Sequence, residues 1–284
     1  MNTQISVLIS VVVPTCHRND LLAKCLDCLA PRNQVLSPDQ YEVIVTDDGS
    51  KSTAELMIAE QYSWVRWTQG PRRGPAANRN HGASLALGSW IAFTDDDCLP
   101  DRLWLSAFRE SIAEDIHVYE GKTVCRDWPN SPLFEAPINE TGGYLWSCNF
   151  LISRCLFLEM GGFDEHFPYA AMEDVDLRER IRDLSKSICF VPTAIVDHPA
   201  RPRRSCKSRM FSRESEAFYF RKRHDRVRVW TDITRPILHE WLRGLVKGPN
   251  RLHFLRLTPL VLAEVFLILV MQRSWRAKHE SILR

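Results

Sequence analysis

The sequence predicts an α/β domain with a mixed, largely parallel sheet flanked by helices, followed by a basic helical extension. Short β-branched and apolar runs alternate with segments of helical periodicity over residues 1–200, which is typical of a parallel sheet with crossover helices. Acidic residues directly follow two of the apolar runs. Residues 201–284 hold 20 of the 37 lysines and arginines but only 7 of the 35 aspartates and glutamates. We therefore expect an acidic catalytic body and a basic tail that meets an anionic partner.

The size and composition exclude several classes of protein. A chain of 284 residues with 45% apolar and 25% charged residues can bury a large core, so disordered and fibrous classes are excluded. The nine cysteines are scattered and odd in number, which argues against a disulfide framework and favours a reducing compartment. The first apolar stretch lacks the basic flank and cleavage site of a signal peptide. We therefore expect a cytoplasmic location.

The first half of the chain is expected to contain four strands separated by helices. β-branched or continuous apolar runs predict strands at residues 5–13, 41–46, 65–67 and 90–94. Apolar residues at helical spacing predict helices at residues 19–29, 53–62 and 76–87. Sheets of this kind bind ligands beyond the carboxyl ends of their strands. Polar residues stand at those ends, namely Thr15, Asp47, Asp48 and Asp95 to Asp97.

The second half is more mixed. Apolar patterns predict helices at residues 101–114, before Gly161 and at 173–184, and strands at 117–125 and 188–196. Residues 126–143 are rich in proline, asparagine and glycine and predict a mobile loop that can cover a substrate. Beyond residue 200 the arginine-rich chain is expected to be helical.

Three consecutive aspartates, Asp95, Asp96 and Asp97, follow the fourth predicted strand. Carboxylates this close raise one another's pKa unless a cation compensates them. A divalent ion carrying phosphate oxygens is such a cation, because Mg²⁺ often binds one or two carboxylates together with substrate phosphates. The alternative is an acidic turn that caps a helix at Asp101.

Two further segments carry groups suited to a nucleotide. Asp47 and Asp48 end the second predicted strand, where a carboxylate can accept a hydrogen bond from a base N–H or a ribose hydroxyl. An ordinary turn at Asp48-Gly49 is the alternative. Arg79 lies in the third predicted helix, and its guanidinium suits a phosphate or the aspartates, the alternative being a solvated surface side chain.

Three later residues are candidates for proton transfer or metal binding. Glu173 and Asp174 open a predicted helix, where a carboxylate can take a proton from an acceptor hydroxyl. The helix dipole alone also favours acidic residues there. His198 follows the last predicted strand and can be a metal ligand or a structural residue.

The longest apolar stretch runs from Leu257 to Met271. It contains Pro259 and Glu264 and is shorter than the roughly 20 residues that a spanning helix needs. Arginines and tryptophans surround it, so we expect a helix on the surface of an anionic bilayer. A core helix or an oligomer contact is the alternative.

In order and spacing, these segments resemble the family 2 glycosyltransferases, inverting enzymes of the Rossmann-like GT-A fold. The resemblance covers about residues 6–198. It rests on Val11 to Thr15, Val45 to Ser50, Asn78 to Gly82, Asp95 to Asp97, and Gly161 to Glu165 with Glu173 to Leu177 and Arg180. It implies a catalytic domain at 1–200, with a nucleotide-sugar-binding half at about 1–100 and an acceptor-binding half at about 101–200, ahead of the extension at 201–284.

The resemblance implies a role for each candidate residue. The nucleotide-sugar, UDP- or dTDP-linked, would be held by Pro14, Thr15, Asp47, Asp48, Arg79, Asp95 and Asp96. The ion, Mn²⁺ or Mg²⁺, would be coordinated by Asp97, Asp95 and His198. The general base would be Asp174, with Glu173 as the second candidate.

Two departures from the family pattern bear on the nucleotide contacts and on the product. Cys16-His17 stands where Tyr-Asn is usual, beside the expected nucleotide contacts. The Gln-x-x-Arg-Trp motif and the several spanning helices of processive members are missing, which favours transfer of a single sugar. The expected acceptor is a glycan or a lipid-linked precursor of cell-surface polysaccharide or glycolipid, at the inner face of the cell membrane.

Two other functions are compatible with parts of the sequence. A sugar-1-phosphate nucleotidyltransferase would need a glycine-rich phosphate loop after the first strand, but Pro14 to Arg18 contains no glycine. A nucleic-acid-binding protein would explain the arginines and interleaved aromatic residues of the extension, but not the acidic body. We therefore expect no nucleic-acid partner.

Overall fold

The chain forms two compact units. The structure is a computed structural model that describes residues 8–51, 53–224, 227–248 and 250–283. The first unit comprises the described residues up to Arg126, with Pro137–Glu165 and Asp174–Pro199. The second comprises Asp127–Ala136, His166–Glu173 and the described residues from Ala200 onward, so two short segments of the body belong to it.

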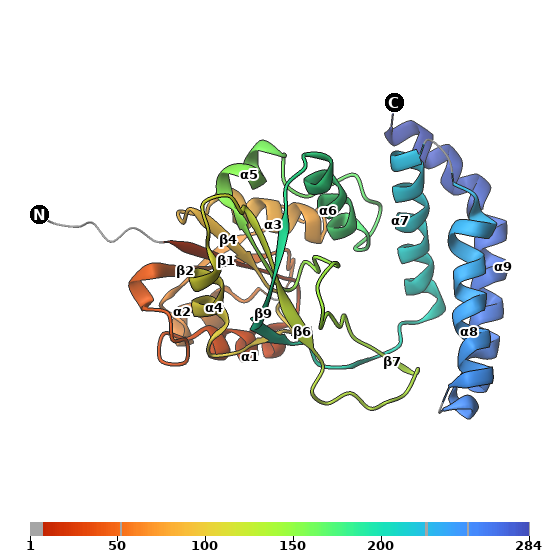
Figure 1. Cartoon of the computed structure of the whole chain (residues 1–284), viewed down its shortest axis with the longest axis horizontal. Coiled ribbons are helices and arrows are strands. Elements are labelled where there is room, and N and C mark those ends of the chain that lie inside the picture. The colour runs from red at the N-terminus through yellow and green to blue at the C-terminus, as the bar shows by residue number, and fades with distance from the viewer. Residues whose placement is uncertain (1–7, 52, 225–226, 249, 284) are drawn as a thin grey trace, which may run out of the picture. The chain divides into compact units, whose positions relative to one another are not determined.

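A sheet of eight strands is the centre of the first unit (Figure 1). The strands are β1 (Ile9–Thr15), β2 (Tyr41–Asp47), β3 (Val65–Gln69), β4 (Trp90–Phe93), β5 (Leu99–Pro100), β6 (Val118–Val124), β8 (Phe150–Ser153) and β9 (Ile188–Asp197). Their order is β3-β2-β1-β4-β8-β6-β9-β5. The first four are parallel neighbours, and β8 is antiparallel to both of its neighbours. The mixed, largely parallel sheet expected from the sequence is confirmed.

Helices cover both faces of this sheet. They are α1 (Asn19–Leu29), α2 (Glu55–Gln61), α3 (Pro75–Ser84), α4 (Trp104–Ser111), α5 (Arg154–Glu159) and α6 (Glu173–Asp183), with a 3₁₀ turn at Pro38–Gln40. Val11 and Val13 of β1 share a core with α1, α2 and α4, whereas Val12 shares the other core with α3, α5 and α6. Side chains alternate between the faces of a strand, so a strand buried on both faces is apolar throughout.

The first strand differs from its prediction. Residues 5–7 of the predicted strand lie outside the described residues, and β1 continues through Pro14 to Thr15. Pro14 is still paired with Thr46 of β2, but the Thr15 carbonyl accepts from the Asp48 N–H on that side, so the backbone of Pro14 faces β4. Proline is tolerated there because the pairing with β4 ends opposite Val12. The two-residue β5 was not predicted, since it is too short to show a periodicity.

The second unit is mainly helical, as expected from the sequence. Its elements are α7 (Cys206–His224), a π-helical turn (Val229–Thr234), α8 (Arg235–Lys247), α9 (Arg251–Ile282) and a ribbon of β7 (Phe134–Glu135) with β10 (Arg201–Pro202). Glu264 is fully buried and forms ion pairs with Arg209 and Arg213. This buried charge is therefore compensated by two cations of the same unit.

Helix α9 is longer than expected. Pro259 lies inside it without ending it, and its 32 residues include a window with a mean hydropathy of 2.2, of which 22% is buried. The expectation that this stretch is too short for a membrane span is wrong, because the helix continues past both ends of the apolar run. Within the described part of the chain, α9 alone can cross a membrane by length and composition.

Candidate active site

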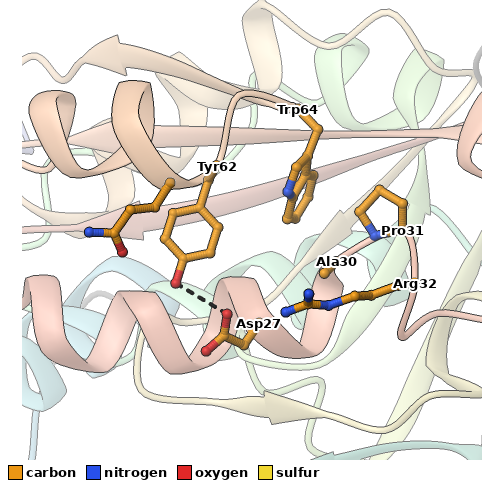
Figure 2. Close-up of a pocket in the computed structure, with 7 residues that line it drawn as sticks. Asp27, Ala30, Pro31, Arg32, Tyr62 and Trp64 are labelled. Atoms are coloured by element: carbon orange, nitrogen blue, oxygen red, sulfur yellow. Dashed lines mark hydrogen bonds between the residues drawn. The ribbon is translucent and has the colours of Figure 1, made fainter.

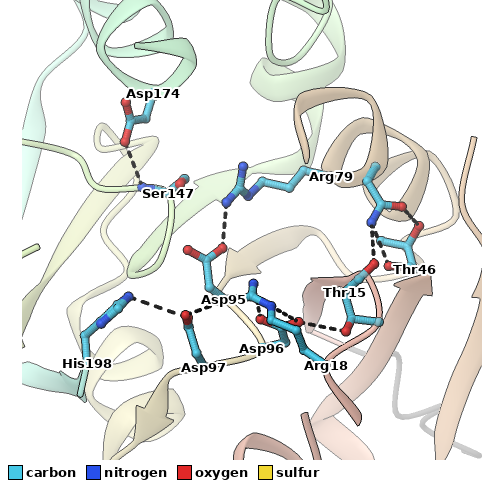
Figure 3. Close-up of polar contacts among 11 residues, drawn as sticks. Thr15, Arg18, Thr46, Arg79, Asp95, Asp96, Asp97, Ser147, Asp174 and His198 are labelled. Atoms are coloured by element: carbon cyan, nitrogen blue, oxygen red, sulfur yellow. Dashed lines mark hydrogen bonds and ion pairs between the residues drawn. The ribbon is translucent and has the colours of Figure 1, made fainter. Parts of the chain in front are cut away.

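The candidate site lies where β1, β2 and β4 end, at the predicted edge of the sheet (Figure 3). Because these strands are parallel, their carboxyl ends bring together residues far apart in the sequence. Asn78 joins the ends of β1 and β2: its amide donates to the carbonyls of Thr15 at 3.3 Å and Thr46 at 2.8 Å, and accepts from the Thr46 hydroxyl. This buried amide keeps the two strand ends in register.

Asp96 is buried and compensated by Arg18. The Thr15 hydroxyl donates to Asp96 Oδ2 at 2.7 Å, and the Arg18 guanidinium lies 2.5 Å from Asp96 Oδ1. Burial raises the pKa of Asp96 to about 7, although Arg18 and Thr15 act to lower it. Arg18 also pairs with Asp97 at 2.9 Å, so one cation spans two of the three carboxylates.

Asp95 is paired with Arg79. Arg79 Nη2 lies 2.6 Å from Asp95 Oδ1, and the Arg79 side chain is only 6% exposed. Burial acts to raise the pKa of Asp95, but Arg79, His198 and Arg18 together hold it below its ordinary value. The sequence left open whether Arg79 is solvated, and the structure shows that it faces an aspartate.

Asp97 and His198 form a pair suited to a divalent cation. His198 Nδ1 lies 3.1 Å from the carbonyl of Pro199, which can only accept, so this hydrogen bond needs the proton on Nδ1. The other ring nitrogen, Nε2, lies 3.5 Å from Asp97 Oδ1. A carboxylate oxygen and an imidazole nitrogen are both ligand types that divalent cations take. Cys98 Sγ lies within 4.8 Å of both ligand atoms, but burial raises the pKa of its thiol well above the usual value.

The two aspartates at the end of β2, Asp47 and Asp48, have different surroundings. Asp47 is buried, and its carboxylate accepts from two backbone N–H groups of its own loop, at 2.7 Å each. Asp48 is half-buried and accepts from the N–H groups of Arg72 and Gly74 at 2.8 and 3.2 Å. Burial raises the pKa of Asp48, while these hydrogen bonds lower it. Asp47 therefore stabilises the loop, and Asp48 is the one of the two that reaches solvent.

Asp174 lies in the first turn of α6. Its carboxylate accepts from the N–H groups of Val175 at 2.8 Å and Ser147 at 3.4 Å. Burial raises the pKa of Asp174, while the Arg79 charge acts to lower it. The Arg79 charge therefore acts to lower the pKa of both Asp174 and Asp95. The neighbouring Glu173 is buried, with 6% of its surface exposed.

Glu120 of β6 fixes the loop that precedes Ser147. Its buried carboxylate accepts from the amide of Asn139 at 3.0 Å and from the backbone N–H groups of Gly143, Tyr144 and Leu145. The end of the predicted mobile loop is therefore attached to the sheet. Directly after it come two stacked rings, Tyr144 and Trp146, whose centroids are 5.2 Å apart.

Arg18, Asn78 and Glu120 were not among the candidate site residues. Arg18 follows the end of β1 by three residues, so its place at the ligand-binding edge was a usable signal. A lone glutamate within the predicted strand at 117–125 signals a buried charge with partners, but it does not say which partners.

Comparison with solved structures shows a glycosyltransferase fold of the GT-A class. The chain matches TarS of S. aureus in complex with UDP-GlcNAc, with a TM-score of 0.58 and 16% identity over 94% of this chain and 92% of TarS residues 1–349. It also matches the mannosyltransferase PcManGT of Pyrobaculum calidifontis, in complex with GDP-Man and Mn²⁺, with a TM-score of 0.59 and 20% identity over 97% of this chain and 84% of that one.

The sequence comparison identifies the family. Residues 10–160 match glycosyl transferase family 2, and the chain belongs to that family. It is therefore a glycosyltransferase, as the motifs predicted. The glycosyltransferase AglE of Haloferax volcanii is 26% identical over 210 residues, 68% of this chain and 67% of AglE. In other curated relatives, among them a chondroitin synthase of Escherichia coli, the matched region spans less than half of the relative's length.

Proposed function

We propose that this enzyme transfers a single sugar, with inversion, from a UDP- or dTDP-sugar to a hydroxyl acceptor and uses a divalent cation. The observation that carries the proposal is the acidic rim of the sheet, where Asp97 faces the Nε2 of His198. The ligands of two structural neighbours, UDP-GlcNAc and GDP-Man with Mn²⁺, support a nucleotide-sugar donor and a metal.

Asp97 and His198 would hold Mn²⁺ or Mg²⁺, with Asp95 beside them. A carboxylate oxygen and an imidazole nitrogen suit such an ion, and Asp95 keeps its Oδ2 for it because Arg79 binds at Oδ1. When bound, the ion stabilises the charge that develops on the departing diphosphate. Asp48 and Thr15 would hold the nucleoside, for which the half-exposed carboxylate of Asp48 is a suitable acceptor.

Asp174 would act as the general base. A base works best with a pKa near the working pH, and burial raises the pKa of this carboxyl in that direction. The acceptor oxygen bonds to the anomeric carbon as the bond from that carbon to the diphosphate breaks, and Asp174 takes the hydroxyl proton. Attack from the face opposite the diphosphate inverts the configuration. Glu173 is the second candidate for this role.

The acceptor would be a glycan or a lipid-linked precursor, and it would meet the loop attached to Glu120. This loop presents Tyr144, 44% exposed, stacked on Trp146. An aromatic face packs well against the apolar side of a sugar ring. Ser147 of the same loop donates to Asp174, which links the aromatic pair to the proposed base.

We infer that the enzyme works at the inner face of the cell membrane, with α9 at the bilayer. Exposed apolar residues recur along α9 at intervals of three, four or seven, namely Leu252, Leu255, Leu262, Phe266 and Leu269. Exposed arginines lie before and after this stripe. Such a surface fits a bilayer that contains anionic lipid.

A donor panel tests the proposed reaction. Release of nucleoside diphosphate is measured from UDP-, dTDP- and GDP-linked sugars in Mn²⁺, Mg²⁺ or EDTA. Turnover is expected with a UDP- or dTDP-sugar, and loss is expected in EDTA and in Asp97→Ala. Glu110→Gln, an exposed change on α4, is the control. Full activity in EDTA would refute the metal, and failure of every donor would refute the transfer.

A further inference from the structure

A pocket of about 440 Å³ lies at the other edge of the sheet (Figure 2). It is lined by Asp27, Ala30, Pro31, Arg32, Gln61, Tyr62 and Trp64. These residues come from the ends of α1 and α2 and from the approach to β3. Since β3 is parallel to β2 and β2 to β1, the start of β3 is separated from the active-site edge by about 20 Å, the length of a strand. The proposed reaction makes no use of this pocket.

The pocket combines an aromatic wall with open polar groups. The rings of Tyr62 and Trp64 meet edge to face, with centroids 6.4 Å apart, and Trp64 is partly exposed. The Tyr62 hydroxyl lies 3.2 Å from Asp27 Oδ1, which fixes the tyrosine ring. Among the described residues, neither the Arg32 guanidinium nor the Gln61 amide has a hydrogen-bond or ion-pair partner.

We propose that this pocket binds one saccharide unit of the acceptor or product glycan. A pyranose has an apolar C–H face, which suits the Trp64 ring, and a rim of hydroxyls, which suits planar carboxylate, guanidinium and amide groups. An apolar ligand would leave those polar groups unpaired. The volume lies within the roughly 300–1,000 Å³ of ligand pockets.

A second point of attachment would favour long acceptors. This consequence rests on the proposed transfer to a glycan. A glycan held at the pocket has a raised effective concentration at the active site. Because the chain must bridge about 20 Å, the KM for an oligosaccharide acceptor is expected to depend on the pocket, whereas that for a monosaccharide acceptor is not.

Calorimetric titration with cellotetraose, chitotetraose and mannotetraose tests the site. The background is Asp97→Ala in EDTA without donor, so that no turnover intervenes. At least one probe is expected to bind, and the double variant Arg32→Ala/Gln61→Ala is expected to weaken binding about tenfold or more, because two hydrogen-bonding groups are lost. Arg109→Ala, an exposed arginine of α4, is the matched control.

The possible outcomes distinguish a failure of the proposed saccharide site from a failure of the proposed transfer reaction. No binding by any probe, or equal binding by the double variant, overturns the saccharide site. Trp64→Phe, which keeps a ring, is expected to weaken binding less than the double variant does, and a folded spectrum confirms that each variant is intact. Donor turnover is measured separately on the wild type, so binding without turnover would refute only the proposed function.

Discussion

Arginines compensate the carboxylates of the site within the protein itself. Arg18 spans Asp96 and Asp97, and Arg79 holds Asp95. Without these cations, three adjacent carboxylates would raise one another's pKa. The aspartates were evident in the sequence, but their partners were not, because Arg18 stands 78 residues before Asp96.

Arg18→Ala is expected to lower the thermal midpoint in EDTA, and Mn²⁺ is expected to restore it. Arg18 and the ion would compensate the same carboxylates, so each matters most when the other is absent. The Arg18 side chain is 43% exposed, so the loss is expected to be about 1 kcal/mol or less. Arg66→Ala is the control, because Arg66 is equally exposed and pairs with Glu42, away from the proposed metal ligands. Equal restoration of both variants by Mn²⁺ would contradict the shared role.

Asp174→Asn is expected to reduce kcat by a factor of about 10²–10⁴, the usual contribution of a general base. Donor affinity, measured by titration, is expected to stay unchanged, because the proposed base would contact the acceptor and not the donor. Glu173→Gln is the comparison variant. If Glu173→Gln loses activity and Asp174→Asn keeps it, the two assignments are reversed.

At the scale of single elements, Glu120 of β6 fixes a loop, and His279 of α9 is expected to make stability depend on pH. The strands and helices of the first unit follow local patterns, but Glu120 fixes its loop through residues 19 to 25 positions away. The length of α9 also escaped prediction, since Pro259 is accommodated within the helix.

Glu120→Gln is expected to loosen residues 139–145. The amide would turn N–H groups toward backbone donors, and each buried donor left unpaired costs about 1–3 kcal/mol. The urea midpoint is expected to fall, and amide exchange in this loop to become faster. Glu140→Gln, whose native side chain is 62% exposed, is the control. Unchanged exchange in the loop would show that Glu120 does not hold it.

His279 of α9 is expected to make stability depend on pH. Burial, with Arg221 and Lys278, lowers its pKa from 6.5 to about 4. Between these values the unfolded chain binds the proton and the folded protein does not, so stability is complete above pH 6.5 and falls as the pH drops toward 4. The thermal midpoint of the wild type is therefore expected to fall by several degrees more between pH 7 and pH 5 than that of His279→Phe. Identical shifts would exclude His279 as the cause.

The distribution of charge and apolar surface along the entire chain favours a membrane partner. Residues 201–284 carry most of the basic excess, and α9 exposes an apolar stripe. The protein is expected to sediment with vesicles that contain anionic lipid and less with neutral ones. Leu262→Gln/Phe266→Gln is expected to reduce binding, whereas Leu56→Gln, at an exposed leucine of α2, is not. High salt screens the attraction between the arginines and anionic lipid. Vesicle binding by the wild type that remains at high salt is therefore assigned to the apolar stripe of α9.

Local patterns in the chain were enough to predict the α/β class and to place the candidate site, with its aspartates, at the carboxyl edge of the sheet. Strand alternation, helical spacing and polar residues after apolar runs all arise between near neighbours, so they can be read without the fold. The folded chain alone shows that Arg79 faces Asp95, that the Nε2 of His198 faces Asp97, and that Glu120 fixes the loop. These partners are distant in sequence and meet only through the order of strands and the packing of helices around them.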